Sequence, residues 1–82
     1  MKLKSLNLIS TGHIGNTTLP AFTSRGYLLI AMTAGSTGTI NFGGGTGEIP
    51  LAADGWYEPY VVPTSEITVT TAGTFVIVSN AQ

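Results

Sequence analysis

The chain has 82 residues, of which three are Lys or Arg and four are Asp or Glu, with one His and no Cys. A domain of this length ordinarily carries about 20 charged residues, so few titratable groups are available for catalysis. The lack of Cys excludes thiolate metal sites and disulfides, and three cations cannot neutralise a row of nucleic-acid phosphates. We expect a single domain, residues 1–82, with no nucleic-acid partner.

The sequence shows no targeting or membrane segment. Its start, Met1 to Lys4, resembles the basic region of a signal peptide, but polar residues from Ser5 onward interrupt any apolar segment. The longest apolar run, residues 27–32, is far shorter than the ~20 residues that span a bilayer. We expect synthesis in the cytoplasm without a signal peptide, and no membrane partner.

The first part of the chain predicts two strands separated by a long connection. Residues 3–10 alternate between apolar and polar side chains, whereas residues 11–18 form a polar loop rich in Thr and Gly. Residues 19–25 have no clear pattern. Residues 27–33 are apolar at consecutive positions, which is typical of a central strand.

Glycine-rich turns divide the middle of the chain. Residues 39–42 alternate as a strand with one buried face. Residues 43–47 contain four Gly and predict a flexible loop, after which residues 48–52 form a short strand. Asp54 and Gly55 are a favoured type I′ pair and predict a hairpin with the strand that follows.

The last part of the chain is the most regular. Residues 56–62 predict an extended run, in which Pro59 indicates an edge strand or a bulge. Residues 66–71 alternate, with Ile67 and Val69 inward, and a short turn at Ala72 and Gly73 leads into residues 74–79, so the two segments predict a hairpin. The whole pattern predicts an all-β domain, a small antiparallel β-sandwich or barrel of six to seven strands, of jelly-roll or immunoglobulin-like type.

The glycine loop at residues 43–47 is the one segment that resembles a phosphate-binding loop. Such a loop needs a Lys and a following helix whose N-terminus receives the phosphate. Here Glu48 and Pro50 follow, which place a negative charge and a helix breaker at those positions. We expect no nucleotide and no other cofactor.

Catalytic and metal-binding groups are also scarce. A Ser-His-Asp triad would have to combine His13 with Asp54, and nothing in their spacing supports that. A pair of catalytic carboxylates could draw on Glu48, Asp54, Glu58 or Glu66, but Asp54 is explained by its turn and Glu58 by the polar side of a strand. No ligand spacing typical of a metal site occurs. The sequence therefore predicts no catalytic, cofactor-binding or metal residues, and a protein that is not an enzyme.

Three aromatic residues, Trp56, Tyr57 and Tyr60, are the candidate interface or binding residues. Because successive strand residues face opposite sides, Trp56 and Tyr60 should point one way and Tyr57 the other. One side should pack in the core, and the other could present rings for a protein interface or for stacking on sugar. We expect Trp56 to anchor the core or a contact between subunits.

Three segments carry a resemblance to a known class of proteins: residues 38–42 (Gly-Thr-Ile-Asn-Phe), residues 54–59 (Asp-Gly-Trp-Tyr-Glu-Pro) and residues 68–77, which contain Ala-Gly-Thr-Phe. Together they resemble the small β-sandwich virion proteins of tailed bacteriophages, of the head-decoration or tail-accessory type. The resemblance implies a homo-oligomer, expected to be a trimer, that binds other virion proteins such as the major capsid protein.

Composition agrees with that implication, because a surface poor in Lys and Glu lacks the usual charged protection of edge strands. We expect a non-enzymatic structural protein, located in the virion, that decorates or cements a bacteriophage particle. The alternative is a carbohydrate-binding or host-surface adhesion module that presents aromatic rings to a glycan.

Overall fold

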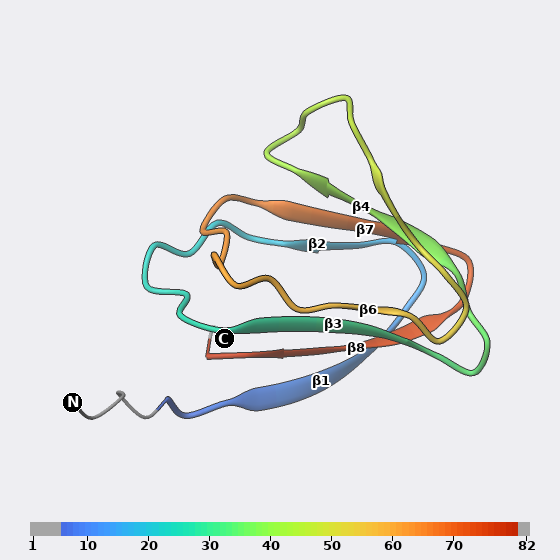
Figure 1. The fold of residues 1–82 in the computed structure, drawn as a ribbon, viewed down its shortest axis with the longest axis horizontal. Coiled ribbons are helices and arrows are strands. Elements are labelled where there is room, and N and C mark those ends of the chain that lie inside the picture. The colour runs from blue at the N-terminus through green and yellow to red at the C-terminus, as the bar shows by residue number, and fades with distance from the viewer. Residues whose placement is uncertain (1–5, 81–82) are drawn as a thin grey trace.

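Eight strands make up the regular structure of residues 6–80, which are the residues that the computed structural model describes. The strands are β1 (Ile9–Ile14), β2 (Thr17–Leu19), β3 (Leu28–Thr33), β4 (Gly38–Phe42), β5 (Ile49–Leu51), β6 (Trp56–Tyr57), β7 (Ile67–Thr71) and β8 (Thr74–Ser79). They form two antiparallel sheets of four strands, with the order β1-β8-β3-β6 in sheet A and β2-β7-β4-β5 in sheet B. Over residues 6–80 there is no helix that could cross a membrane. The predicted all-β sandwich is confirmed, with two layers that are visible in Figure 1.

The core lies between the two sheets and follows the alternation of the strands. In β3 and β8 every second residue is buried, and the buried residues of the two strands stand opposite each other, as in the pair Ile30 and Ile77. Nine hydrophobic side chains form the core: Leu28, Ile30, Met32, Ile40, Leu51, Ile67, Val69, Phe75 and Ile77. Burial of this cluster supplies the main driving force for folding.

The connections cross between the sheets more often than the sequence predicts. Of the strands that follow one another in the chain, β4 and β5 pair in one sheet, whereas β7 belongs to sheet B and β8 to sheet A. The hairpin predicted for residues 66–79 is therefore wrong. The hairpin predicted at Asp54 and Gly55 is also wrong, because it leads from β5 in sheet B to β6 in sheet A. Each crossing turns the buried faces of two consecutive strands toward each other across the core.

The N-terminal region differs from its prediction as well. Of the strand predicted at residues 3–10, residues 3–5 lie outside the described part, and β1 starts at Ile9. Residues 11–18 are not a loop, because β1 continues to Ile14 and β2 follows after a turn at Gly15, whose φ is 76°. Thr and His residues pair here with β8, which supplies a strong strand partner.

β6 is shorter than the extended run predicted for residues 56–62.

Hydrogen bonds between neighbouring turns join the sheets at the end where β1 leads into β2. Three side chains accept bonds from main-chain N–H groups of other segments: Asn16 from Thr71 at 3.0 Å, Ser36 from Thr74 at 3.0 Å and Asp54 from Gly35 at 2.8 Å. These bonds link segments that are far apart in the chain. They explain why small polar residues occupy these turns, since each satisfies a main-chain donor that no strand partner reaches.

Candidate functional site

The outward side of sheet A carries an unusual set of side chains. In β3 and β8 the residues between the buried ones face away from the core, and their partners in β1 and β6 face the same way. We call this surface the sheet A face. It consists of Ser10, Gly12 and Ile14 of β1, Thr74, Val76 and Val78 of β8, Leu29, Ala31 and Thr33 of β3, and Trp56 of β6. None of these ten residues is charged.

The apolar members of this face are direct neighbours across the strands. Leu29 stands opposite Val78, and Ala31 stands opposite both Val76 and Trp56. Trp56 is 68% exposed and Ile14 is 81% exposed, so the two margins of the face project most into solvent. The centre of the face is therefore an apolar band that runs across four strands.

Sheet B shows the opposite composition on its outward side. The corresponding surface, the sheet B face, consists of Thr18, Thr39, Asn41, Pro50, Thr68 and Thr70. Hydroxyl and amide groups are what a solvent-facing side of an antiparallel sheet normally presents. The apolar sheet A face is thus a local property of one layer of the sandwich.

Trp56 and Tyr57 face opposite sides, as the strand geometry requires. Tyr57 packs against the core and its ring lies 5.8 Å from that of Phe42, and burial raises the pKa of its hydroxyl. Trp56 faces the other way and does not belong to the core, which corrects one of the two settings expected for it. Tyr60 is fully exposed beyond the end of β6.

One carboxylate lies at the margin of the sheet A face. The Tyr27 hydroxyl, just before β3, donates a hydrogen bond to the Glu58 carboxylate, just after β6. This bond raises the pKa of Tyr27, because it stabilises the protonated hydroxyl. Glu58 thus joins two segments at the rim and leaves the apolar band itself without charge.

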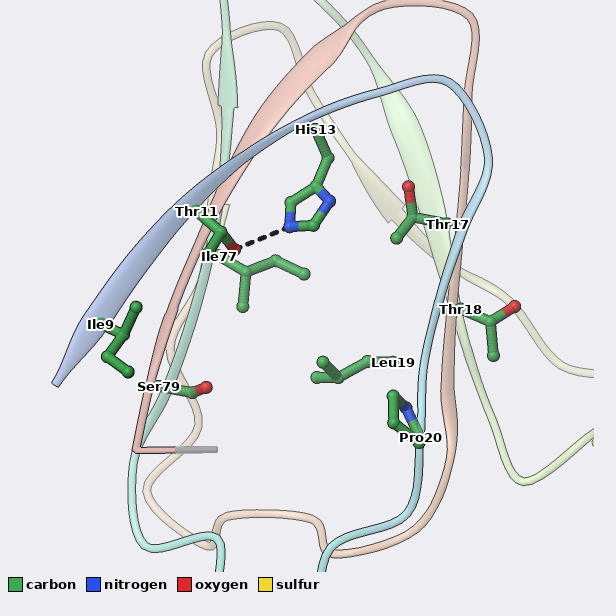
Figure 2. A pocket seen from close by; sticks show the side chains of 9 residues that line it. All are labelled: Ile9, Thr11, His13, Thr17, Thr18, Leu19, Pro20, Ile77 and Ser79. Atoms are coloured by element: carbon green, nitrogen blue, oxygen red, sulfur yellow. Dashed lines mark hydrogen bonds between the residues drawn. The ribbon is translucent and has the colours of Figure 1, made fainter. Parts of the chain in front are cut away.

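A hollow of about 280 Å³ lies on another side of the molecule, between the edge strands β1 and β2. It is lined by Ile9, Thr11, His13, Thr17, Thr18, Leu19, Pro20, Ile77 and Ser79. β1 has six residues and β2 only three, so sheet B does not cover the inward side chains of β1. Figure 2 shows Leu19 and Ile77 extending into this hollow.

The one His of the chain lines this hollow and contacts two neighbouring side chains. His13 Nε2 lies 2.7 Å from Thr11 Oγ1, a hydrogen bond drawn in Figure 2. Its ring stacks on Phe75, with centroids 5.2 Å apart. Asp54, the acid that a triad would need, accepts its bond from the Gly35 N–H in a turn. The structure brings His13 together with hydroxyls and an aromatic ring.

The glycine loop at residues 43–47 is a hairpin loop between β4 and β5, and in Figure 1 it projects away from the two layers. The Gly43 N–H donates to the Glu66 carbonyl and the Gly45 N–H to the Phe42 carbonyl. The Asn41 side chain donates to the carbonyls of Gly45 and Gly47. Among residues 6–80, no three His, Asp or Glu side chains gather as a metal site would require.

Comparison of the chain with protein-family models, with curated proteins and with solved structures finds no match. The surfaces of the molecule are therefore the evidence for its function.

Sequence reasoning did not identify Leu29, Ala31, Val76 and Val78 as site residues. Residues 27–33 carried a signal for this face. They are apolar at both alternating sets of positions, whereas a strand in a two-layer sandwich can bury only one of the two sets.

Proposed function

We propose that this protein is a non-enzymatic structural protein of a tailed bacteriophage particle, which decorates or cements the capsid or serves as a tail accessory. It acts by binding protein surfaces, among them its own copies, as a trimer in the form that the resemblance implies, and other virion proteins such as the major capsid protein. The observation that carries this proposal is the sheet A face, which joins Trp56 with Val76, Val78, Leu29 and Ala31 without a charged residue.

Such a face suits a protein partner for two physical reasons. Extended exposed apolar patches are uncommon on monomeric soluble proteins and mark interaction sites. The centres of protein interfaces are depleted in charge and enriched in aromatic residues, and Trp56 lies within the apolar band. Contact with another protein would remove this surface from water at about 25 cal/mol per Å².

The virion location rests on the resemblance together with the composition. The three resembling segments correspond to β4, to the turn before β6 with β6 itself, and to β7 with β8. A chain with seven charged residues in 82 relies little on charge for its solubility. A place within a protein lattice, where neighbours cover most of the surface, fits that property.

A carbohydrate-binding or host-surface adhesion module is the second candidate, and the exposure of Trp56 and Tyr60 favours it. Exposed aromatic rings can stack on sugar. Binding sites for small polar ligands also need converging polar groups that fix the ligand. Along its row Trp56 has the apolar neighbours Ala31 and Val76, and at the same margin the Glu58 carboxylate is already bonded to the Tyr27 hydroxyl, so we favour the protein partner.

The test is the protein composition of purified particles. Quantitative peptide mass spectrometry of particles purified from the lysate should find this chain in many copies per particle. Recovery of the chain free in the lysate and its absence from particles would overturn the proposal. In parallel, the recombinant chain should bind no sugar on a glycan array, whereas binding that Trp56→Ala abolishes would support the adhesion module.

A further inference from the structure

We infer that the sheet A face packs against the sheet A faces of the other copies in the homo-oligomer. The inference rests on the proposed function only in treating this face as a protein-binding surface. It adds the face by which the copies meet and names the residues at the contact. Val76 and Ala31 would lie at the centre of that contact, with Ile14 and Trp56 at its two margins.

The charge distribution favours a copy of the same chain over another partner. When a face packs on its own copy, residues near the symmetry axis meet residues of the same kind, so any charge there would face a like charge. The ten residues of the sheet A face satisfy this requirement because none is charged. A partner that presented charged groups would find nothing on this face to pair with them and would lose their hydration.

The charged residues of the described part lie elsewhere. Arg25 is buried, and Glu48, Asp54 and Glu66 lie in loops and turns outside sheet A. Glu58 is at the rim and is bonded to Tyr27. An apolar centre surrounded by polar and charged groups is the usual anatomy of a protein interface.

The sheet A face supplies part of the area that self-association needs. A standard interface buries about 800 Å² on each partner, which is about 15% of the 5199 Å² of accessible surface of this chain. Strands of six residues are roughly 20 Å long, and four strands are roughly 15–20 Å wide. The projecting side chains of Ile14 and Trp56 enlarge this area.

A matched pair of variants tests the inference with the full chain. Val76→Glu places a carboxylate at the centre of the sheet A face, in the central strand β8. Thr70→Glu places the same carboxylate on the sheet B face, in the central strand β7. At micromolar concentration in sedimentation equilibrium, the parent chain and Thr70→Glu should have a mass of two or more copies. Val76→Glu should have the 8.5 kDa mass of one chain.

Two further measurements keep the test decisive if Val76→Glu folds poorly. Ile14→Lys changes a side chain that is 81% exposed on the same face, so it should fold and should dissociate the assembly. Trp56 is the single Trp of the chain, so its fluorescence reports the face directly. Dilution of the parent should shift its emission to the red, and Ile14→Lys should show the red-shifted emission at every concentration.

The inference is overturned if the parent chain is a monomer, or if Val76→Glu and Ile14→Lys associate as the parent does. Dissociation of Thr70→Glu would also overturn it. A monomeric parent whose binding to particles is lost in Val76→Glu would show that this face binds a different virion protein. A monomer that is abundant in particles would contradict this inference and support the proposed place in the virion. An oligomer that is absent from particles would support this inference and contradict that place.

Discussion

The Arg25 guanidinium donates a hydrogen bond of 2.7 Å to the main-chain carbonyl of Pro63, which lies 38 residues further along the chain. The same group donates to the carbonyls of Pro20 and Ser65, so that one side chain joins the connection between β2 and β3 to the connection between β6 and β7. Arg25 is only 4% exposed, and burial lowers the pKa of its guanidinium. Within residues 6–80 its hydrogen bonds all go to carbonyl oxygens, and its Nε has no partner.

Replacing Arg25 should destabilise the fold more than any change of an exposed charge. Arg25→Ala leaves three carbonyl groups without this donor, so we expect the free energy of unfolding to fall by about 3 kcal/mol. Arg25→Lys keeps the charge but offers a single nitrogen, and we expect it to recover only part of the loss. Urea denaturation measures both variants, with Glu48→Ala as the exposed control. Equal midpoints for Arg25→Ala and Glu48→Ala would contradict this prediction.

Gly38 is required where β4 passes close to β7. A Cβ at this position would lie 2.7 Å from the Thr70 carbonyl oxygen and 3.0 Å from the Thr71 Cβ. Because a main-chain oxygen cannot move aside alone, Gly38→Ala should lower the free energy of unfolding by about 1–3 kcal/mol. At Gly47 a Cβ would meet no atom within 4 Å, so Gly47→Ala should not destabilise the protein. Thermal melting of the two variants side by side decides whether the close approach has this cost.

Alkaline pH should weaken the fold through its buried tyrosine. Burial raises the pKa of Tyr57 above its ordinary value of 10.0, so the unfolded chain loses this proton at a lower pH than the folded chain. The associated stability is present below pH 10 and is lost as the pH rises toward the raised value. Tyr27 adds to the same trend, because its bond to Glu58 also raises its pKa.

The free energy of unfolding, measured against pH above neutrality, should therefore decline less steeply in Tyr57→Phe than in the parent. Tyr60→Phe, which alters a fully exposed ring, should follow the parent curve. Parallel curves for the parent and Tyr57→Phe would show that burial of this hydroxyl does not govern the alkaline loss.

Truncation of Trp56 should separate assembly from folding. Because the side chain is 68% exposed, we expect Trp56→Ala to change the stability of the monomer by no more than ~0.5 kcal/mol. A Trp in the core would instead lose more stability on truncation. Self-association should weaken, and sedimentation of the variant at several concentrations measures this. An unchanged assembly, combined with loss of glycan binding, would favour the adhesion module.

Local patterns in the sequence determined most of the strands and, where apolar and polar residues alternate, the side that is buried. Residues 67–71 alternate in burial as their side chains predict, and the opposite directions of Trp56 and Tyr57 follow from the pleat alone. These properties depend on neighbours one or two positions apart. They could therefore be predicted without knowledge of the fold. Residues 28–32 and 75–78 are apolar at every position, so their buried side was decided by the tertiary structure.

The tertiary structure alone decided which sheet each strand joins. A short turn such as the one between Thr71 and Thr74 can close a hairpin or carry the chain across the core, and both arrangements bury the same side chains. Pairing of β8 with β1 and β3 selects the crossing. Because pairing joins residues far apart in the chain, it decided the apolar sheet A face, the hollow beside His13 and the burial of Arg25, none of which is encoded in any short segment.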